Sequence, residues 1–195
     1  MKLDIVFSGV GGQGVVVLSD IYCEAAMIEG FDASKAEIHG MAQRGGSIVA
    51  YARIGDKVES PLIEMGKADV IVGFEILETA RALPMLKPNG TVIVNMKYIP
   101  PISSALGTKP KKTEDLMTLL KTKAKVHEVD GVGIAEKLGN LLVVNTILLG
   151  ALSALPEIPV KVESFQQAIA GKIKQKFIDL NLKAFELGRK SVLES

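Results

Sequence analysis

A glycine-rich segment near the start of the chain is the strongest candidate for a ligand-binding loop. Gly9, Gly11 and Gly14 fit the pattern G-x-G-x-x-G, with Gly12 and Gln13 between them, after an apolar run and before a helix-like stretch. Glycine permits a tight turn and the close approach of an anion, and a helix N-terminus presents free N–H groups with a partial positive charge. This chemistry suits a phosphate or pyrophosphate, although a strand-to-helix crossover that binds nothing has the same pattern.

The acid that a nicotinamide dinucleotide site requires is less well placed. Such sites carry an Asp or Glu about 20 residues after the glycines, at the end of the second strand. Asp32 and Glu37 lie at about that distance, but their segment, FDASKAEIHG, has no convincing apolar run before the acid. A stand-alone dinucleotide-dependent oxidoreductase is therefore a weaker hypothesis, which the sequence leaves open.

A second unusual segment, residues 39–47 (HGMAQRGGS), precedes a predicted strand. It begins at His39 and places Arg44 between Gln43 and Gly45. The fixed fork of donors on a guanidinium suits a carboxylate or phosphate. In a parallel sheet, a loop that precedes a strand lies at the edge opposite the glycine loop unless the chain is irregular there. A surface turn with a solvated arginine, and a structural role for the histidine, are the alternatives.

The elements that must position these loops alternate between apolar strands and helices. The patterns predict strands at residues 3–8, 47–54, 69–73, 91–95 and 125–129, and helices at residues 13–29 and 75–83. Apolar strands separated by helices predict an α/β fold, a Rossmann-like doubly wound, mostly parallel sheet with helices on both faces. Asn95 ends one predicted strand, so its side chain could face the ligand crevice or form an Asx turn.

The C-terminal half adds two helical predictions. Residues 138–156 contain no charged residue, but polar and small residues within them favour a buried or subunit-interface helix over a membrane span. An amphipathic stretch over residues 164–192 predicts one long C-terminal helix. We therefore expect a single domain over residues 1–195, with a C-terminal helical extension from about residue 160, that does not function alone.

Composition excludes several classes of protein. Apolar residues make up 48% of the 195 residues, which is enough for a sizeable core, and the net charge of +1 gives no case for nucleic acid or an anionic membrane. The single cysteine, Cys23, excludes an intrachain disulfide and a cluster built from this chain's own thiolates. We expect a buried Cys23 thiol in a cytoplasmic protein.

Lysines are concentrated in the third quarter of the chain. They could attract the phosphates of a ligand, an acidic ferredoxin or an acidic face of a partner, or they could form an ordinary solvated surface. These lysines are Lys97, Lys109, Lys111, Lys112, Lys121, Lys123 and Lys125.

Together, GVGGQG (residues 9–14) and HGMAQRGGS (residues 39–47) resemble the gamma-type subunits of 2-oxoacid:ferredoxin oxidoreductases. The similarity is greatest to the small, or beta, subunit of indolepyruvate ferredoxin oxidoreductase. The strands DVIVG and TVIVN and the late helix containing Asn145 fit the same layout. Pyruvate-type relatives tend to carry a double arginine followed by Gly-Ala-Pro at the second loop, so Arg44-Gly45-Gly46 favours the indolepyruvate branch and aryl pyruvates.

The resemblance implies an oxidative decarboxylation that turns a 2-oxoacid and coenzyme A into an acyl-CoA, carbon dioxide and reduced ferredoxin. It implies that thiamine diphosphate and [4Fe-4S] clusters reside in a large alpha subunit, because this chain has no Gly-Asp-Gly thiamine signature and too few cysteines. No catalytic residue is then expected here. The resemblance makes both loops ligand-binding or interface segments; a gamma subunit of a pyruvate or branched-chain enzyme, and a non-enzymatic scaffold, are the alternatives.

Overall fold

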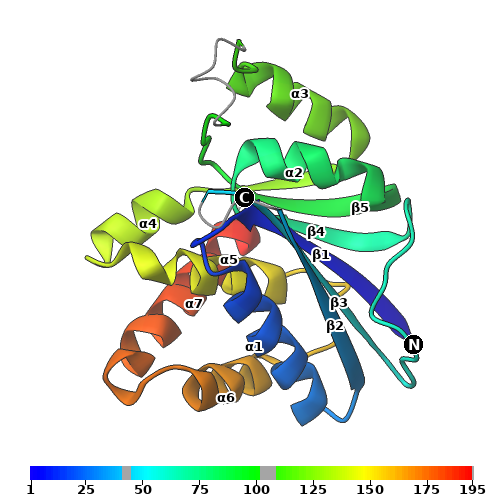
Figure 1. The fold of residues 1–195 in the computed structure, drawn as a ribbon. Coiled ribbons are helices and arrows are strands. Elements are labelled where there is room, and N and C mark those ends of the chain that lie inside the picture. The colour runs from blue at the N-terminus through cyan, green and yellow to red at the C-terminus, as the bar shows by residue number, and fades with distance from the viewer. Residues whose placement is uncertain (41–44, 102–108, 195) are drawn as a thin grey trace.

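The computed structural model describes residues 1–40, 45–101 and 109–194 and places a six-stranded sheet between two layers of helices (Figure 1). The strand order is β2-β3-β1-β4-β5-β6. The strands are β1 (Lys2–Val10), β2 (Asp32–His39), β3 (Ser47–Gly55), β4 (Ala68–Gly73), β5 (Leu86–Asn95) and β6 (Lys125–Val129). The helices are α1 (Val15–Ile28), α2 (Ile76–Ala82), α3 (Thr113–Lys123), α4 (Gly131–Lys137), α5 (Val144–Ser153), α6 (Val162–Lys172) and α7 (Ile178–Leu193).

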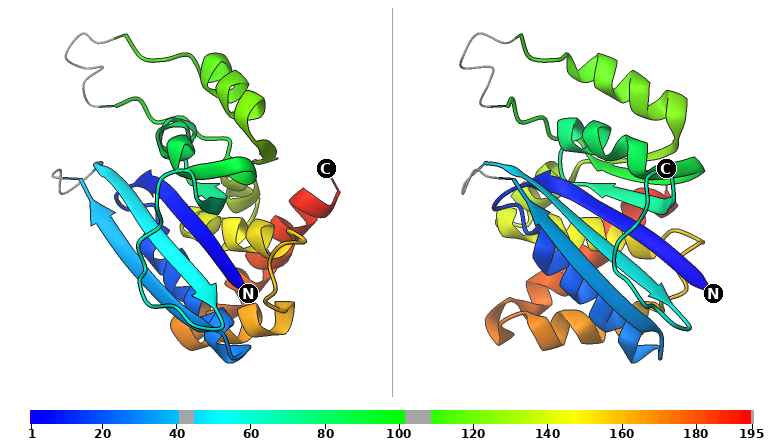
Figure 2. Two further views of the ribbon diagram at one scale, coloured as in Figure 1. Left: turned by 90° about the vertical axis from the view of Figure 1, so that its right-hand side faces the viewer. Right: turned by 45° about the vertical axis from the view of Figure 1, so that its right-hand side comes forward.

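Alternation along the strands divides the core into two parts. Ile5 and Phe7 of β1 belong to the apolar cluster that includes α1, α5, α6 and α7, whereas Val6 belongs to the cluster with α2 and α3. Figure 2 shows the same two layers from the side, with α2 and α3 on one face of the sheet. The prediction of a mostly parallel sheet covered on both faces is therefore confirmed.

The direction of β3 differs from the expectation for a doubly wound sheet. β1, β4, β5 and β6 run parallel, but β3 lies between β1 and β2 and runs antiparallel to both. Ser47 at the start of β3 consequently stands opposite Val10 at the end of β1. β2 was not predicted, because as a partly exposed edge strand it has no apolar run.

The predicted long C-terminal helix is present as α7, but it does not extend over all of residues 164–192. α6 ends at Lys172, the next two residues have extended ψ angles of 141° and 137°, and a short 3-10 turn (Gln175–Phe177) leads into α7. The break reverses the chain so that α6 and α7 pack on each other, with the rings of Phe165 and Phe185 5.7 Å apart between centroids. The amphipathic pattern continues through the break because both helices bury their apolar faces in the same core.

The helix in the uncharged segment, α5, is buried as predicted, although the segment also contains exposed residues before it. After a 3-10 turn at Leu141–Val143, every residue of α5 from 145 to 152 is buried. A Cβ on Gly150 would stand 2.0 Å from the carbonyl oxygen of Phe185, and one on Gly188 would stand 1.9 Å from that of Ile147. Small residues are thus needed where α5 and α7 touch. Among the described helices, none is long and apolar enough to cross a membrane.

Candidate functional site

The glycine loop joins β1 to α1 at the carboxyl edge of the parallel strands. Gly12 and Gly14 have φ angles of 98° and 85°, which L side chains rarely adopt. Gly9 is needed for packing, because a Cβ there would stand within 2.9 Å of three side-chain atoms. Gly11 has no such steric demand, since its nearest neighbours would be 3.7 Å away. The glycines therefore shape the turn and leave its outer side open.

Two predicted site residues stabilise this edge of the sheet through their side chains. Gln13 folds back over the loop, where its Oε1 accepts the N–H of Val10 at 2.7 Å and its Nε2 donates to the carbonyl of Phe74 at 3.3 Å. Asn95 is 1% exposed; its Nδ2 donates to the same carbonyl at 3.0 Å, and its Oδ1 accepts the N–H of Gly131 at 3.0 Å. These side chains tie together β1, β4, β5 and α4, and neither functions simply as a free ligand-binding group.

The second loop lies beside the first, and not at the opposite edge. Because β3 is antiparallel to β1, its start meets the end of β1, and the N–H of Gly11 donates to the carbonyl of Gly46 at 2.9 Å. Gly45, with a φ of 71°, belongs to this return. Gln43 and Arg44 lie outside the described residues. The structure thus brings together the described parts of both predicted loops.

His39, at the end of β2, lies apart from the contact between the two loops. Its side chain is 56% exposed and its Nε2 stands 3.1 Å from Glu37. Hydrogen bonding to Lys35, with a smaller contribution from His39, holds the pKa of the Glu37 carboxyl below its usual value. Because β3 separates β2 from β1, this acid is two strand spacings, about 10 Å, from the glycine strand. It does not occupy the ribose-binding position of a dinucleotide site.

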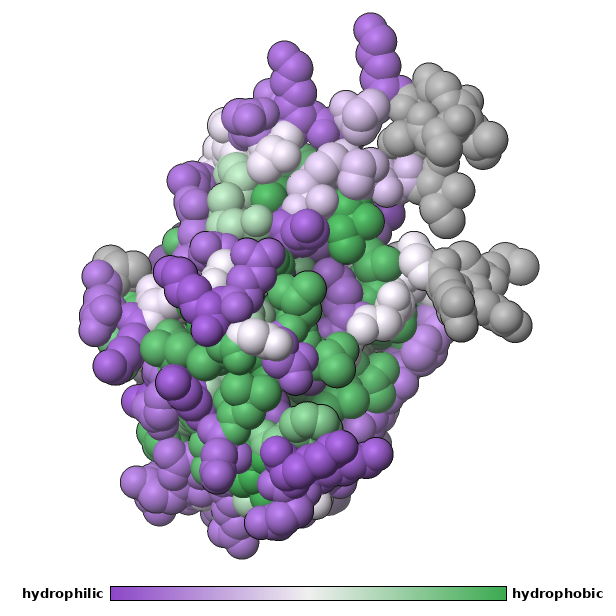
Figure 3. All heavy atoms as spheres, turned by 90° about the vertical axis from the view of Figure 1, so that its left-hand side faces the viewer, coloured by the Kyte–Doolittle hydropathy of each residue, from purple (hydrophilic) through white to green (hydrophobic). Residues whose placement is uncertain are grey.

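A cavity of about 480 Å³ opens at the carboxyl edge in front of the glycine loop. Apolar side chains form most of its wall, and Leu142 and Leu141 are 79% and 57% exposed. Figure 3 faces this side of the molecule and shows a broad hydrophobic area in its middle. The lining residues are Gly12, Gln13, Gly14, Val17, Asn95, Lys97, Ile99, Val132, Leu141, Leu142, Val144 and Asn145.

Among the polar side chains of the lining, Asn145 and Lys97 are the two that were not predicted as site residues. Asn145 is 9% exposed, and its Oδ1 accepts the N–H of Thr146 at 2.8 Å, which orients Nδ2 toward the loop. That nitrogen stands 2.9 Å from where a Cβ on Gly14 would be, and it has no acceptor among the described residues. The sequence signal was a polar residue at the start of an otherwise apolar helix.

Backbone donors add to this arrangement. The first three N–H groups of α1, from Val15 to Val17, have no acceptor in the part of the chain that the structure describes. Together with the helix dipole, the Asn145 amide and the Lys97 ammonium, they form a set of donors with no acidic residue among the cavity's lining. Such a set of donors suits an oxyanion, and the apolar wall suits an apolar group.

The fold and the site define the class of this protein: a Rossmann-like α/β domain with two loops at the edge of the sheet where such domains bind ligands. The chain belongs to the pyruvate ferredoxin/flavodoxin oxidoreductase family, whose sequence model matches residues 4–191. It is 42% identical to the indolepyruvate oxidoreductase subunit IorB of Archaeoglobus fulgidus (96% of this chain, 94% of the relative) and 37% identical to that of Thermococcus kodakarensis (99% and 97%). The pyruvate oxidoreductase subunit PORC of Thermotoga maritima superimposes with a TM-score of 0.74 at 26% identity (97% and 96%). The resemblance predicted from the two loops is confirmed.

Proposed function

We propose that this chain is the small subunit of a cytoplasmic indolepyruvate ferredoxin oxidoreductase. The complex would oxidatively decarboxylate an aryl pyruvate with coenzyme A, giving an acyl-CoA, carbon dioxide and reduced ferredoxin. Four relatives named IorB, at 36–42% identity over nearly the whole chain, support this assignment. Gamma subunits shared by pyruvate and ketoisovalerate enzymes match at 30–34%, so a gamma role in such a complex is the second candidate.

The residues of this chain do not fit the redox cofactors of the reaction. A four-iron cluster needs several thiolates, and the chain has one cysteine, Cys23, which is buried and whose thiol pKa is raised to about 12 by that burial. Among the described residues, no three His, Cys, Asp or Glu side chains are grouped to hold a metal ion. We therefore assign the clusters to a larger partner subunit, together with thiamine diphosphate, for which this chain has no Gly-Asp-Gly signature.

The observation that carries our proposal is a cavity with unused donors at the glycine loop, which the second loop contacts from beside it through Gly11 and Gly46. The N-terminus of α1, Asn145 Nδ2 and Lys97 suit the phosphate of an anionic co-substrate, for which coenzyme A is the candidate. The apolar wall suits an aliphatic part of such a ligand or an apolar segment of the partner. This chain would then bind and orient the co-substrate, and the partner would supply the reacting centre.

The first experiment is an anaerobic purification of the tagged chain from its native host. We expect a larger subunit to co-purify in fixed ratio, with thiamine diphosphate and a broad absorbance near ~400 nm from iron–sulfur centres. Aryl pyruvates should then drive ferredoxin reduction that depends on coenzyme A. A colourless chain that elutes alone with a bound nucleotide would refute the subunit assignment and favour a stand-alone dinucleotide-dependent enzyme.

The second experiment tests the cavity in the purified complex. Asn145→Asp keeps the oxygen that accepts the Thr146 N–H but replaces the free donor by an acceptor. We expect this variant to raise the KM for coenzyme A by about 10- to 100-fold, which corresponds to one hydrogen bond to a charged group. Lys183→Gln, on the exposed side of α7, is the control and should leave that KM unchanged. An unchanged KM in Asn145→Asp would remove the phosphate from this cavity without affecting the subunit assignment.

A further inference from the structure

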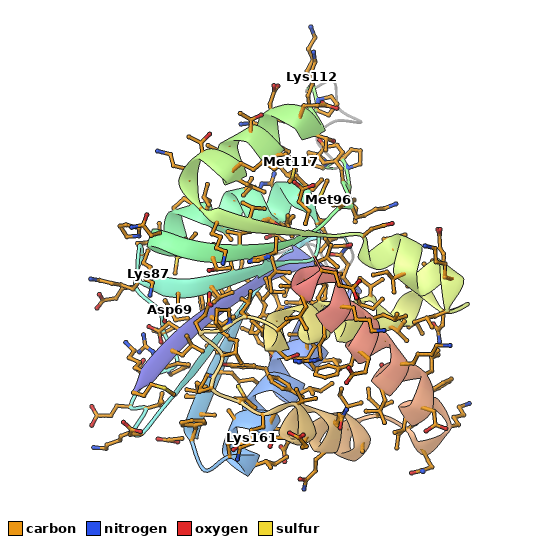
Figure 4. The ribbon with its side chains drawn as sticks, turned by 180° about the vertical axis from the view of Figure 1, so that it is seen from behind. Asp69, Lys87, Met96, Lys112, Met117 and Lys161 are labelled. Carbon is orange, nitrogen blue, oxygen red and sulfur yellow. The ribbon has the colours of Figure 1, made fainter. Side chains whose placement is uncertain are left out.

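A second hollow lies on the other helix layer, at the amino ends of β4 and β5. It has a volume of about 700 Å³ and is bounded by the end of α2, the 3-10 turn Leu83–Met85, the start of β5 and the last turns of α3. Figure 4 shows that Lys87 and Asp69, at this edge, lie far from Met96, which follows the carboxyl end of β5. This α2–α3 groove is therefore separate from the glycine-loop cavity.

The floor of the α2–α3 groove is apolar although it faces solvent. Ala80 and Leu83 contribute from one side and Leu119 from the other, together with Leu86 of β5. α3 buries Leu116, Met117 and Leu120 against the sheet layer, but Leu119 stays 40% exposed. An exposed leucine over an apolar hollow is a surface that gains from being covered.

Positive charge gathers at the α3 side of the groove, where Lys121 and Lys123 lie in the last turn of α3 and Lys125 begins β6. Between residues 81 and 128 the chain has nine Lys and Arg but only three Asp and Glu, in a protein whose net charge is +1. Three of these cations have acidic partners, in the pairs Arg81–Glu78, Lys87–Asp69 and Lys121–Glu128. The other six make no ion pair with a described residue: Lys97, Lys109, Lys111, Lys112, Lys123 and Lys125. Lys97 lines the glycine-loop cavity and Lys109 and Lys111 line a different hollow, so the unpaired lysines at this end of α3 are Lys123 and Lys125.

Lys123 connects the two properties, because it lines the groove and has no ion pair among the described residues. Lys87, on the opposite side, shares its charge with Asp69. An acidic side chain above Lys123 would complete a charge pair, while apolar side chains one helical turn away would reach Leu119 and Leu83. This combination fits an amphipathic segment with Asp or Glu on its outer positions.

We propose that the α2–α3 groove docks an acidic amphipathic segment of the larger subunit. This inference rests on the proposed function, because it requires such a partner. Docking here leaves the glycine-loop cavity at the other edge free for a co-substrate. It also gives Lys123, which has no ion pair among the described residues, an acidic partner.

The test measures assembly of the full chain with its partner subunit. Leu119→Ser removes the apolar contact, and Lys123→Glu reverses the rim charge; both positions are at the surface of α3. We expect Leu119→Ser to weaken assembly by about tenfold at all salt concentrations, as loss of a well-covered apolar contact does. Lys123→Glu should weaken it by about fivefold at low salt, with a smaller effect at high salt, because screening reduces rim electrostatics. Lys183→Glu, at an exposed position on α7, changes the net charge by the same amount as Lys123→Glu and should assemble like the wild type.

A photo-crosslinking residue at position 119 provides an independent readout if a variant is poorly folded. It should attach to one segment of the larger subunit rich in Asp and Glu. Wild-type assembly of both variants, or crosslinks only to a small electron-carrier protein, would overturn the inference while leaving the subunit assignment intact. Failure of the wild-type chain to bind any larger subunit would refute the proposed function, and this inference with it.

Discussion

Replacing Asn95 by alanine tests whether this residue supports the site or belongs to it. Its buried side chain makes two hydrogen bonds, to the carbonyl of Phe74 and from the N–H of Gly131, each 3.0 Å long. Gly131 is the first residue of α4 and is itself buried, so its N–H would lose its partner in a buried position. The Phe74 carbonyl would keep one donor, Gln13 Nε2 at 3.3 Å.

These contacts set the magnitude. Each of the two neutral hydrogen bonds contributes about 1 kcal/mol to stability. Leaving the buried N–H of Gly131 unpaired costs roughly 1–3 kcal/mol, and the loss of its hydrogen bond already includes part of this cost. We expect Asn95→Ala to lower the free energy of unfolding by about 3 kcal/mol. For a chain of this size, that change corresponds to a fall in Tm of about 6–12 °C.

Urea and thermal unfolding followed by circular dichroism would measure this effect, since the chain has no tryptophan. The double variant with Gln13→Ala should be less stable than the two single losses predict, because the shared Phe74 carbonyl then has neither side-chain donor. A loss below about 0.5 kcal/mol for Asn95→Ala, with coenzyme A binding abolished, would show that Asn95 binds ligand and does not brace the fold.

Three further predictions concern the layer of α1, α6 and α7. Gly188→Ala should cost about 2–3 kcal/mol by thermal unfolding, because its Cβ would stand 1.9 Å from a backbone oxygen of α5, whereas Gly171→Ala, with open space around it, should be neutral or slightly stabilising. Cys23, buried and with a thiol pKa of about 12, should react with a disulfide reagent only after unfolding; rapid reaction of the native chain would contradict its burial. The hydrogen bond from Ser164 holds the pKa of the Glu29 carboxyl below its ordinary value. The stability that this bond contributes is therefore present above the ordinary pKa and is lost as pH falls through the lowered pKa. Glu29→Gln should lower the stability at neutral pH and show a smaller further loss on acidification.

The sequence predicted those strands whose pattern is set by burial on both faces. β1, β4 and β5 contain continuous apolar runs because helices cover both sides of them. β2 escaped prediction because Lys35 and Glu37 alternate with residues that are only partly buried at an edge. Strand direction was also hidden, since hydrophobic alternation is the same in a parallel and an antiparallel strand.

The break between α6 and α7 was hidden for a related reason. Residues on both sides of it keep helical spacing, and no proline or asparagine marks the turn. The reversal comes from tertiary packing of Phe165 against Phe185, which local periodicity does not encode. For the site, the glycine pattern predicted the loop, but the unused donor on Asn145 became visible only when α5 was placed against Gly14.

The position of β3 explains why a dinucleotide-like loop accompanies a different function. A strand inserted between β1 and β2 moves Glu37 two strand spacings away from the glycines. The Glu37 carboxylate also forms an ion pair with Lys35. The same insertion, because it is antiparallel, brings the second loop into hydrogen-bond contact with the first at Gly11. One change of topology thus removes the ribose partner of a dinucleotide and places two loops side by side at the edge that carries the unused donors. The cavity at this edge has no Asp, Glu, His or Cys among its described lining residues, so what the chain contributes there is a set of hydrogen-bond donors.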